Sequence, residues 1–285
     1  MYMGIKNLFK LIKQKAPDAI SSNTIDFYSN KIIGIDANLM IYKIIFGIRS
    51  SGKDIMKNGK VITHIHGILQ KIKGFQKHLT RPIFVFDGEF PEFKQAEILR
   101  RSTSKINVKE SEYSDIIKII RIFGYQVIMS KGEADNQLAY LAKNRMIDYV
   151  ATDDMDLLLF GKNIKILKNF SVNLKKNIIE INSNLVLKNL DIDRSQMIDI
   201  GILSGCDYCG SAKGIGPIKG YNLIRKYGSL QKLIKMNLIQ IKMSEEEIKI
   251  IQKYFKNKKK LLDIKYKKNP IKTKELEKFM KSYGI

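Results

Sequence analysis

The sequence predicts an α/β fold with a mostly parallel, twisted sheet flanked by helices. Short apolar runs alternate with amphipathic stretches along most of the chain, which is typical of a parallel sheet covered by helices. The runs expected to form strands are 31–36, 81–87, 125–130 and 148–153, and the pair 164–170 and 177–181 has the spacing of a β-hairpin. The helical stretches between them include 61–79, 111–123 and 133–144.

The charge of the chain favours a polyanionic partner. Its 285 residues contain 51 Lys and Arg against 28 Asp and Glu, a formal net charge of +23. Nucleic acid is the first partner that such an excess indicates, and an anionic membrane surface is the second. A solvated, lysine-rich surface without a specific partner is the alternative. We expect no membrane span, because no run reaches about 18 consecutive apolar residues, and we expect an intracellular protein, because the N-terminus lacks a signal-peptide core.

The two cysteines, Cys206 and Cys209, have a C-x-x-C spacing. A zinc site would need two further ligands, which His64 and His66 could supply in principle. The spacing differs from that of zinc fingers, and the context is not the strand-to-helix turn of a thioredoxin-like motif. We therefore expect two ordinary thiols in a reducing interior.

Acidic residues follow several of the expected strands. Asp36 and Asp87 each end a strand, Asp153 and Asp154 follow the residues YVAT in the run 148–153, and Glu133 and Asp135 open the helix after the run 125–130. Ligands of open parallel sheets bind beyond the carboxyl ends of the strands, so these acids should meet at one edge. A single such aspartate is often only a helix N-cap. Carboxylates from several strands, without a catalytic Ser-His-Asp or Cys-His set, indicate a Mg²⁺ site.

A second signal is the sequence GIGP, Gly214 to Pro217, between expected helices at 194–204 and 218–227. Proline favours the first position of a helix, and the N–H groups at a helix N-terminus can bind phosphate. The basic residues near this turn are Lys213, Lys219, Arg225 and Lys226. A tight turn between helices is the simpler explanation of the glycines.

Together these motifs resemble those of the structure-specific 5′ nucleases, which include flap endonuclease, exonuclease 1, a Holliday-junction resolvase and an excision-repair nuclease. The matching segments occur in family order almost from end to end: MGIKNLFKLIKQKAPDAI, IGIDANLMIYKIIFGIR, VFDGEFPEFKQAEILRR, GEADNQLAYLAK, ATDDMDLLLFG and LSGCDYCGSAKGIGP. The resemblance implies a PIN-like α/β core and a helix-three-turn-helix module that binds duplex DNA.

The resemblance also implies an active site with two Mg²⁺ ions, for which Mn²⁺ could substitute. The residues that it marks as metal ligands are Asp36, Asp87, Glu133, Asp135, Asp154, Asp156 and Asp207. Asp36 and Asp87 are counted among the catalytic residues as well. Asp153 falls at a position that does not bind metal directly in the family.

The implied DNA contacts lie in several segments. Lys94 and Arg101 match basic residues that contact the scissile phosphate and take part in catalysis, and Tyr42 matches an aromatic residue on which a terminal base stacks. The other matching DNA contacts are Gly4, Lys213, Gly214, Gly216 and Lys219. The backbone carbonyls of Ser211 and Ile215 match those that hold K⁺ in the helix-three-turn-helix.

The chain departs from flap endonucleases at three places. Only the six residues 102–107 separate Arg101 from the next helical pattern, which is too short for the helical cap of those enzymes. No glutamine-and-diphenylalanine sliding-clamp motif is present in the sequence. A Met-Tyr pair precedes the Met-Gly of the family signature, so either Met1 or Met3 is the native start.

These observations predict one nuclease domain, 1–285, that acts on branched or nicked duplex DNA in replication, repair or recombination. Within it, 1–101 and 124–193 form the two halves of the core, 102–123 a shortened arch, 194–240 the helix-three-turn-helix and 241–285 a C-terminal helical segment. We expect a monomeric 5′ flap endonuclease with possible 5′–3′ exonuclease activity. It should act in the nucleus or another site of DNA replication, or in the cytoplasm if the source is viral or prokaryotic. A non-catalytic junction-binding protein and a PIN-type ribonuclease are the alternatives.

Overall fold

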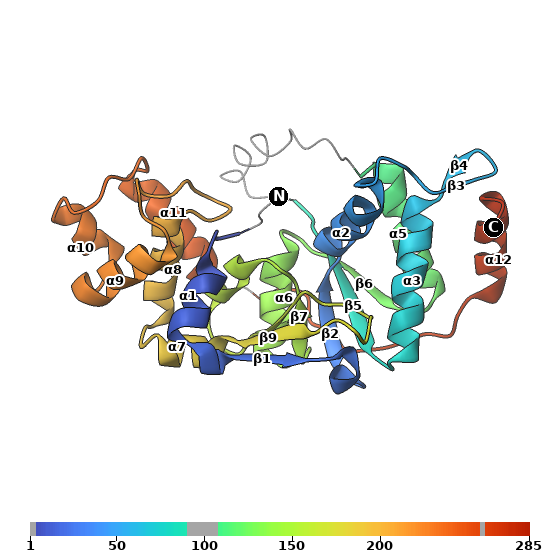
Figure 1. Ribbon diagram of the computed structural model, residues 1–285, viewed down its shortest axis with the longest axis horizontal. Coiled ribbons are helices and arrows are strands. Elements are labelled where there is room, and N and C mark those ends of the chain that lie inside the picture. The colour runs from blue at the N-terminus through green and yellow to red at the C-terminus, as the bar shows by residue number, and fades with distance from the viewer. Residues whose placement is uncertain (1–3, 90–107, 257–259) are drawn as a thin grey trace.

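The fold is built on one twisted sheet with helices on both faces (Figure 1). The computed structural model describes residues 4–89, 108–256 and 260–285. Its main sheet has the strand order β1-β9-β8-β7-β2-β5-β6. The strands are Ile20–Asn23 (β1), Ile32–Asp36 (β2), Arg81–Phe86 (β5), Gln126–Met129 (β6), Tyr149–Ala151 (β7), Lys165–Lys168 (β8) and Ile178–Asn182 (β9).

The strands from β8 to β6 are parallel to their neighbours, and β9 pairs antiparallel with β8 and β1. This arrangement confirms the mostly parallel sheet and the expected hairpin. The edge strand β1 was not predicted, because the sequence ISSN has no apolar alternation. A separate two-stranded hairpin joins Met56–Lys57 (β3) to Lys60–Val61 (β4).

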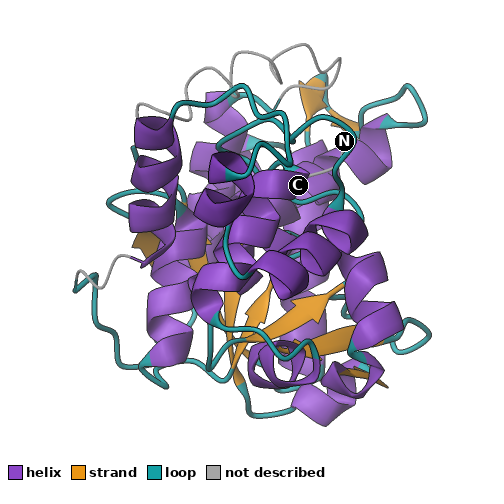
Figure 2. Cartoon of the chain, turned by 90° about the vertical axis from the view of Figure 1, so that its left-hand side faces the viewer, coloured by secondary structure: helices purple, strands orange, loops and turns teal. Residues whose placement is uncertain are grey.

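The helices cover the two faces of the sheet in separate groups. Their bounds are Leu8–Lys15 (α1), Ala37–Arg49 (α2), Thr63–Lys77 (α3), Glu110–Ile122 (α5), Ala134–Lys143 (α6), Ser183–Asn189 (α7), Arg194–Ser204 (α8), Pro217–Tyr227 (α9), Leu230–Lys235 (α10), Glu245–Lys256 (α11) and Thr273–Ser282 (α12). Short 3₁₀ turns lie at Pro17–Ala19 (η1), Ile25–Tyr28 (η2) and Met155–Phe160 (η4). Helices stand in front of the strands when the molecule is viewed from the side of α8 to α11 (Figure 2).

Two apolar cores follow from the alternation of side chains along the strands. In β5, Ile83 and Val85 pack into the core formed with α1, α6 and α8. Phe84 and Phe86 point to the opposite core, which α2, α3 and α5 close. Both faces of the central strands are therefore buried, as a parallel sheet requires.

Helix α5 occupies most of the range 102–123 that we assigned to the shortened arch. Its residues Ile116, Ile119 and Ile120 are fully buried in the second core. Residues 110–122 therefore belong to the core, and a shortened arch could include only residues before Glu110. Residues 90–107, which include the six-residue interval, lie outside the described residues.

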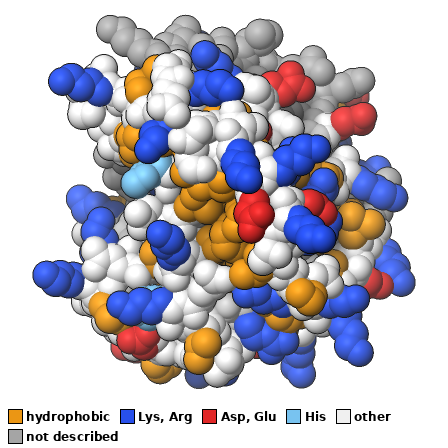
Figure 3. All heavy atoms as spheres, turned by 90° about the vertical axis from the view of Figure 1, so that its right-hand side faces the viewer, with side chains coloured by type: hydrophobic (Ala, Val, Ile, Leu, Met, Phe, Trp, Pro, Cys, Tyr) orange, Lys and Arg blue, Asp and Glu red, His pale blue; other side chains and the backbone are white. Residues whose placement is uncertain are grey.

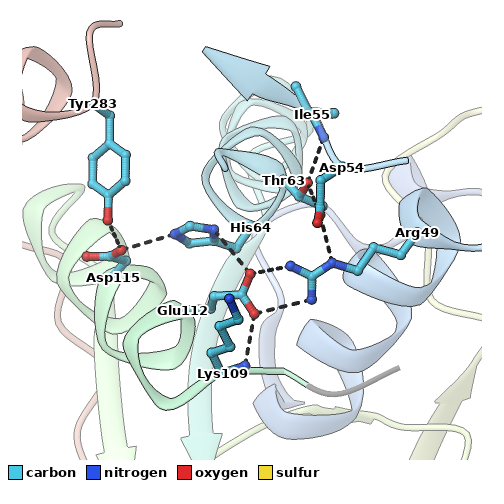
Figure 4. A network of polar contacts seen from close by, with 9 residues as sticks. All are labelled: Arg49, Asp54, Ile55, Thr63, His64, Lys109, Glu112, Asp115 and Tyr283. Carbon is cyan, nitrogen blue, oxygen red and sulfur yellow. Dashed lines mark hydrogen bonds and ion pairs between the residues drawn. The ribbon is translucent and has the colours of Figure 1, made fainter. Parts of the chain in front are cut away.

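A network of charged side chains ties α5 to its neighbours (Figure 4). Glu112 accepts hydrogen bonds from Arg49 (2.5 Å) and from the backbone N–H of Lys109 (2.9 Å). Asp115, one turn later, contacts His64 at 3.1 Å and accepts from the Tyr283 hydroxyl. The network fixes the start of α5 against α2 and α3 and holds α12 in place.

The surface carries the charge excess of the sequence. On the face that bears α12, Lys and Arg side chains are spread around a central apolar strip, and Asp and Glu are fewer (Figure 3). In the described part of the chain, no helix is both long and apolar enough to cross a membrane.

Candidate active site

The predicted acids meet at the carboxyl ends of the parallel strands. Asp36 is the last residue of β2, and Asp87, Glu133 and Asp154 follow the ends of β5, β6 and β7. Together they line a cavity of about 200 Å³. The side chains lining this cavity are Asp36, Asn38, Leu39, Tyr42, Asp87, Tyr113, Glu133, Ala134, Asp135, Asp154 and Asp207. Six of the seven proposed metal ligands thus reach one hollow from different parts of the chain.

Hydrogen bonds from backbone N–H groups at the starts of helices orient Asp36 and Asp87. Asp36 caps α2 by accepting from the N–H of Leu39 (3.0 Å), and its other oxygen accepts from the Thr152 hydroxyl (3.1 Å). Asp87 accepts from the N–H of Ala134 at the start of α6 (2.8 Å). The N-termini of α2 and α6 thereby hold the carboxylates of Asp36 and Asp87 in place.

Asp156 does not line the cavity, and its carboxylate binds the backbone. Its two oxygens accept from the N–H groups of Ile5 (2.7 Å) and Asp207 (3.0 Å). Asp207 in turn accepts from the N–H of Gly4 (3.0 Å). Asp156 therefore joins the N-terminal segment to the loop after α8, in addition to any role as a ligand.

Like charges crowd this edge of the sheet. Burial raises the pKa of Asp36 to about 6, and the neighbouring Asp87 raises it as well. Burial, followed by the charges of Asp154 and Asp207, raises the pKa of Asp156 well above its ordinary range. A cluster of this kind gains most from a cation that removes the mutual repulsion of the carboxylates.

The donor set suits a hard divalent ion, because all seven side chains offer carboxylate oxygens. As the side chains lie, however, no three His, Cys, Asp or Glu in the described part of the chain converge in a way that would hold an ion. The chemistry of the cluster fits Mg²⁺, and the coordination itself is a proposal.

Asp153, the first aspartate of the sequence ATDDMD, does not line this cavity. It accepts from the N–H of Asn169 (2.6 Å) and forms ion pairs with Lys43 and, at 3.8 Å, with Lys168. Sequence reasoning missed both lysines. Lys43 follows Asp36 by seven residues, or two turns of α2, which places both on one face of the helix. This spacing could have predicted a lysine beside the acids. Lys43 and Lys71 line a second cavity, of about 130 Å³, beside the acids.

Two tyrosine hydroxyls contact Glu133, and sequence reasoning missed both. Tyr208 and Tyr254 donate to the same oxygen, Oε2, at 2.5 and 2.6 Å. Burial, together with the negative charge of Glu133, raises the pKa of both phenols far above their ordinary range. Both therefore remain protonated donors.

The structure places the expected DNA contacts at different distances from the acids. Tyr42 lines the cavity and stacks on Phe46 with ring centroids 5.7 Å apart. Gly4 touches the acids directly, since its backbone binds Asp207. Lys94 and Arg101 lie outside the described residues.

The loop between α8 and α9 begins at the acids and leads away from them. Asp207 is near its start, Lys213 is exposed farther along the loop, and Lys219 is exposed in the first turn of α9. Gly214 adopts a positive φ of 69°, and Pro217 begins α9 after Gly216, as expected. The remaining expected residues of this loop are exposed Ser211 and buried Ile215. Outside the loop, Arg225 forms an ion pair with Asp191 at 2.8 Å.

The two cysteines are free thiols, with Sγ atoms 3.5 Å apart. The hydrogen bond with Cys209, followed by burial, raises the pKa of the Cys206 thiol. His64, which was weighed as a zinc ligand with them, contacts Asp115 and Glu112 instead.

Comparisons with known proteins agree with this architecture. The model of the XPG N-terminal domain matches residues 3–107, and that of the XPG I-region matches residues 124–207. Flap endonuclease 1 of Aspergillus clavatus is 32% identical over 261 residues, covering 82% of this chain and 66% of that protein. Flap endonuclease 1 of Kluyveromyces lactis is 30% identical over 259 residues, covering 82% and 68%. The chain thus spans about two thirds of the length of these relatives.

Among solved structures, the catalytic core of Rad2 in complex with DNA substrate has a similar fold. Its TM-score is 0.78 at 22% sequence identity, and the match covers 99% of this chain and 95% of that one. The similarity in fold and the sequence identity to the curated relatives lead to the same assignment. The chain belongs to the flap endonuclease family of structure-specific 5′ nucleases.

Proposed function

We propose that the chain is a Mg²⁺-dependent nuclease that hydrolyses phosphodiester bonds in DNA at 5′ flaps and related nicks, gaps and junctions. The observation that carries this proposal is the cavity at the ends of β2, β5, β6 and β7, which is lined by six carboxylates. A protein that only binds junctions would have no need for so many buried like charges, which cost stability. The family relationship supports the same activity.

The residues that would hold two Mg²⁺ or Mn²⁺ ions are Asp36, Asp87, Glu133, Asp135, Asp154, Asp156 and Asp207. When bound, such ions activate water and stabilise the charge that develops on the phosphate. The protein holds Asp36 and Asp87 in fixed orientation through the starts of α2 and α6. The Asp156 carboxylate keeps the segment at Ile5 and the loop at Asp207 against the site.

The DNA-binding role rests on charge and on the loop from 205 to 216. Exposed Lys213 and Lys219 flank the N-terminus of α9, where backbone N–H groups can take a phosphate. We propose that this loop and its helices act as the helix-three-turn-helix of the family, with K⁺ at the carbonyls of Ser211 and Ile215. A module for duplex DNA favours a DNA nuclease over a PIN-type ribonuclease. Exonuclease activity, a monomeric state and a role in nuclear DNA replication, repair or recombination belong to the same proposal.

Cleavage of a matched panel of DNA substrates tests the proposal. The panel holds one labelled sequence as a 5′ flap, nick, gap, bubble and four-way junction, with Mg²⁺ or with EDTA. We expect Mg²⁺-dependent cleavage, with the 5′ flap among the preferred substrates and a 5′-phosphate on the product. Binding to flaps without cleavage in Mg²⁺ or Mn²⁺ would favour the junction-binding alternative. Cleavage confined to an RNA panel would favour the ribonuclease.

A further inference from the structure

Glu133 differs from the other strand-end acids in how its side chain is held. Asp36 and Asp154 each accept a hydrogen bond from the helix or turn that they precede. Glu133 occupies the same N-cap position of α6, but its side chain makes no capping hydrogen bond. Its backbone is fixed, because its carbonyl accepts from the Ser130 hydroxyl at 3.1 Å. The local chain therefore sets the position of Glu133 but not the direction of its carboxylate.

Two phenols from distant elements supply that direction. The hydroxyls of Tyr208 and Tyr254 both donate to Oε2 of Glu133, at 2.5 and 2.6 Å, and lie 3.3 Å from each other. Glu133 is only 3% exposed, so these bonds are shielded from water. Hydrogen bonds to a carboxylate are among the stronger ones, since the acceptor is charged.

The packing around α11 shows why Tyr254 reaches this point. Phe255, the next residue, is fully buried and packs edge-to-face on Phe160 and on Tyr208, at 5.2 and 5.3 Å between centroids. The Tyr254 and Tyr208 rings are 5.0 Å apart. An aromatic cluster thus anchors the end of α11 and turns the Tyr254 hydroxyl toward Glu133.

We propose that Tyr254, together with Tyr208, is a positioning residue that holds the Glu133 carboxylate toward the metal-binding cavity. The inference rests on the proposed function. Glu133 lines the cavity, so the direction in which its carboxylate is held decides whether it can face an ion there. Partners of this kind orient metal ligands, and their loss typically costs about 10- to 100-fold in metal affinity or activity. Helix α11 would then contribute to the active site although it carries no ligand.

The variant Tyr254→Phe removes only the hydroxyl and keeps the ring in the aromatic cluster. Mn²⁺ is titrated into the DNA-free protein and followed by calorimetry. We expect the Mn²⁺ affinity to fall by about 10-fold and kcat on a 5′ flap to fall similarly. The KM for DNA should stay within about twofold, because Tyr254 is not proposed to touch DNA.

Tyr140→Phe is the matched control. The Tyr140 hydroxyl donates to Asp263 at 2.6 Å, a phenol–carboxylate bond of the same length, and Tyr140 lies on the helix that Glu133 precedes. Its removal should leave Mn²⁺ affinity and kcat at wild-type values. Thermal melts of both variants separate a loss of stability from a loss of ion binding.

A double-mutant cycle tests whether Tyr254 acts through Glu133. In a Glu133→Ala background, Tyr254→Phe should cause no further loss of Mn²⁺ affinity, because the carboxylate that it orients is gone. An additive loss in that background would overturn the inference, as would a Tyr254→Phe protein that matches Tyr140→Phe. If the wild-type protein neither binds Mn²⁺ nor cuts flaps, the proposed function fails as well, so the two failures are distinguishable.

Discussion

The backbone N–H of Gly4 donates a hydrogen bond to Oδ1 of Asp207, 3.0 Å away and 203 residues later in the chain. Asp156 makes the corresponding bond to Ile5, so two acids of the site hold consecutive residues of the N-terminal segment. A Cβ atom at Gly4 would lie 2.1 Å from Oδ1 of Asp154. The N-terminal segment is therefore part of the wall of the active site, and a side chain has no room at this position.

Gly4→Ala should strongly impair ion binding and cleavage. The new methyl group must displace the Asp154 carboxylate, and φ at this residue is +73°, which favours glycine. We expect flap cleavage at saturating Mg²⁺ to fall by at least about 100-fold, or roughly 2.7 kcal/mol of barrier.

Gly59→Ala is the control for the backbone cost alone. Its φ is +74°, and a Cβ there would meet no atom within 4 Å. It should destabilise the protein by about 1 kcal/mol while cleavage stays near wild type. Equal loss of cleavage in both variants would show that strain, and not contact with Asp154, explains the effect.

Asp153 and Asp154 are neighbours in sequence with different expected roles. Asp154→Ala should abolish Mg²⁺-dependent cleavage while flap binding in EDTA survives, because Asp154 lines the cavity. Asp153→Ala removes the ion pairs with Lys43 and Lys168 and the hydrogen bond from the Asn169 N–H, all outside the cavity, and its cleavage rate should stay within about tenfold of wild type. Rates and binding are measured on the same flap. Near-normal turnover of Asp154→Ala would contradict the site assignment.

The metal-free protein should lose stability as pH rises through the range from about 4 to 6. The pKa of Asp36 is raised from its usual 3.8 to about 6 by burial and by Asp87. Between these values the folded state keeps a proton that the unfolded state releases, so the free energy of unfolding decreases with pH and levels off above about 6. Urea unfolding in EDTA across pH 4 to 7 measures the slope.

Asp36→Asn should flatten this pH dependence and raise the stability of the metal-free protein at pH 7 by on the order of 1–3 kcal/mol. Asparagine keeps an oxygen that can accept from the Leu39 N–H, so the cap of α2 is retained. The same variant should lose cleavage. An unchanged slope would mean that other groups dominate the pH dependence.

The strand-end acids could be predicted because their meeting depends on topology alone. Once β2, β5 and β6 are parallel neighbours, the residues after them share an edge of the sheet, whatever the details of packing. The contact of Tyr254 with Glu133 could not be predicted in this way. It spans 121 residues and depends on how α11 packs against Phe160 and Tyr208. Strand β1 was missed because its pairing with β9, and not its sequence pattern, makes it a strand.

Binding to duplex DNA should fall steeply with salt concentration, since Lys and Arg displace condensed counterions. Lys219→Ala should weaken binding to all duplex sequences alike and reduce the salt slope by about 1. Lys162→Ala should leave the affinity and the salt slope unchanged. Lys162 is an exposed lysine before the start of β8, whereas the acids lie at the carboxyl ends of the parallel strands. Fluorescence anisotropy at several salt concentrations measures both quantities. A loss confined to one DNA sequence would argue against a phosphate contact.

A bulky group on the 5′ end of a flap should slow this enzyme only a little. By resemblance, flap endonucleases check for a free 5′ end with a helical cap between the basic gateway and the next core helix. Here buried α5 already begins at Glu110, so at most the eight residues 102–109 follow Arg101 before the core resumes. Ordinary helices average about 11–12 residues, and this interval is too short for a helical pair.

The comparison of free and 5′-blocked flaps at equal enzyme concentration tests this expectation. Because we expect the check for a free 5′ end to be weak, the initial rates on the two flaps should agree within about tenfold. Bubbles or gapped forks should be cut at measurable rates. A drop of about 100-fold on the blocked flap corresponds to roughly 2.7 kcal/mol of barrier. Such a drop would show that the check for a free 5′ end persists despite the short interval, and this prediction would be wrong.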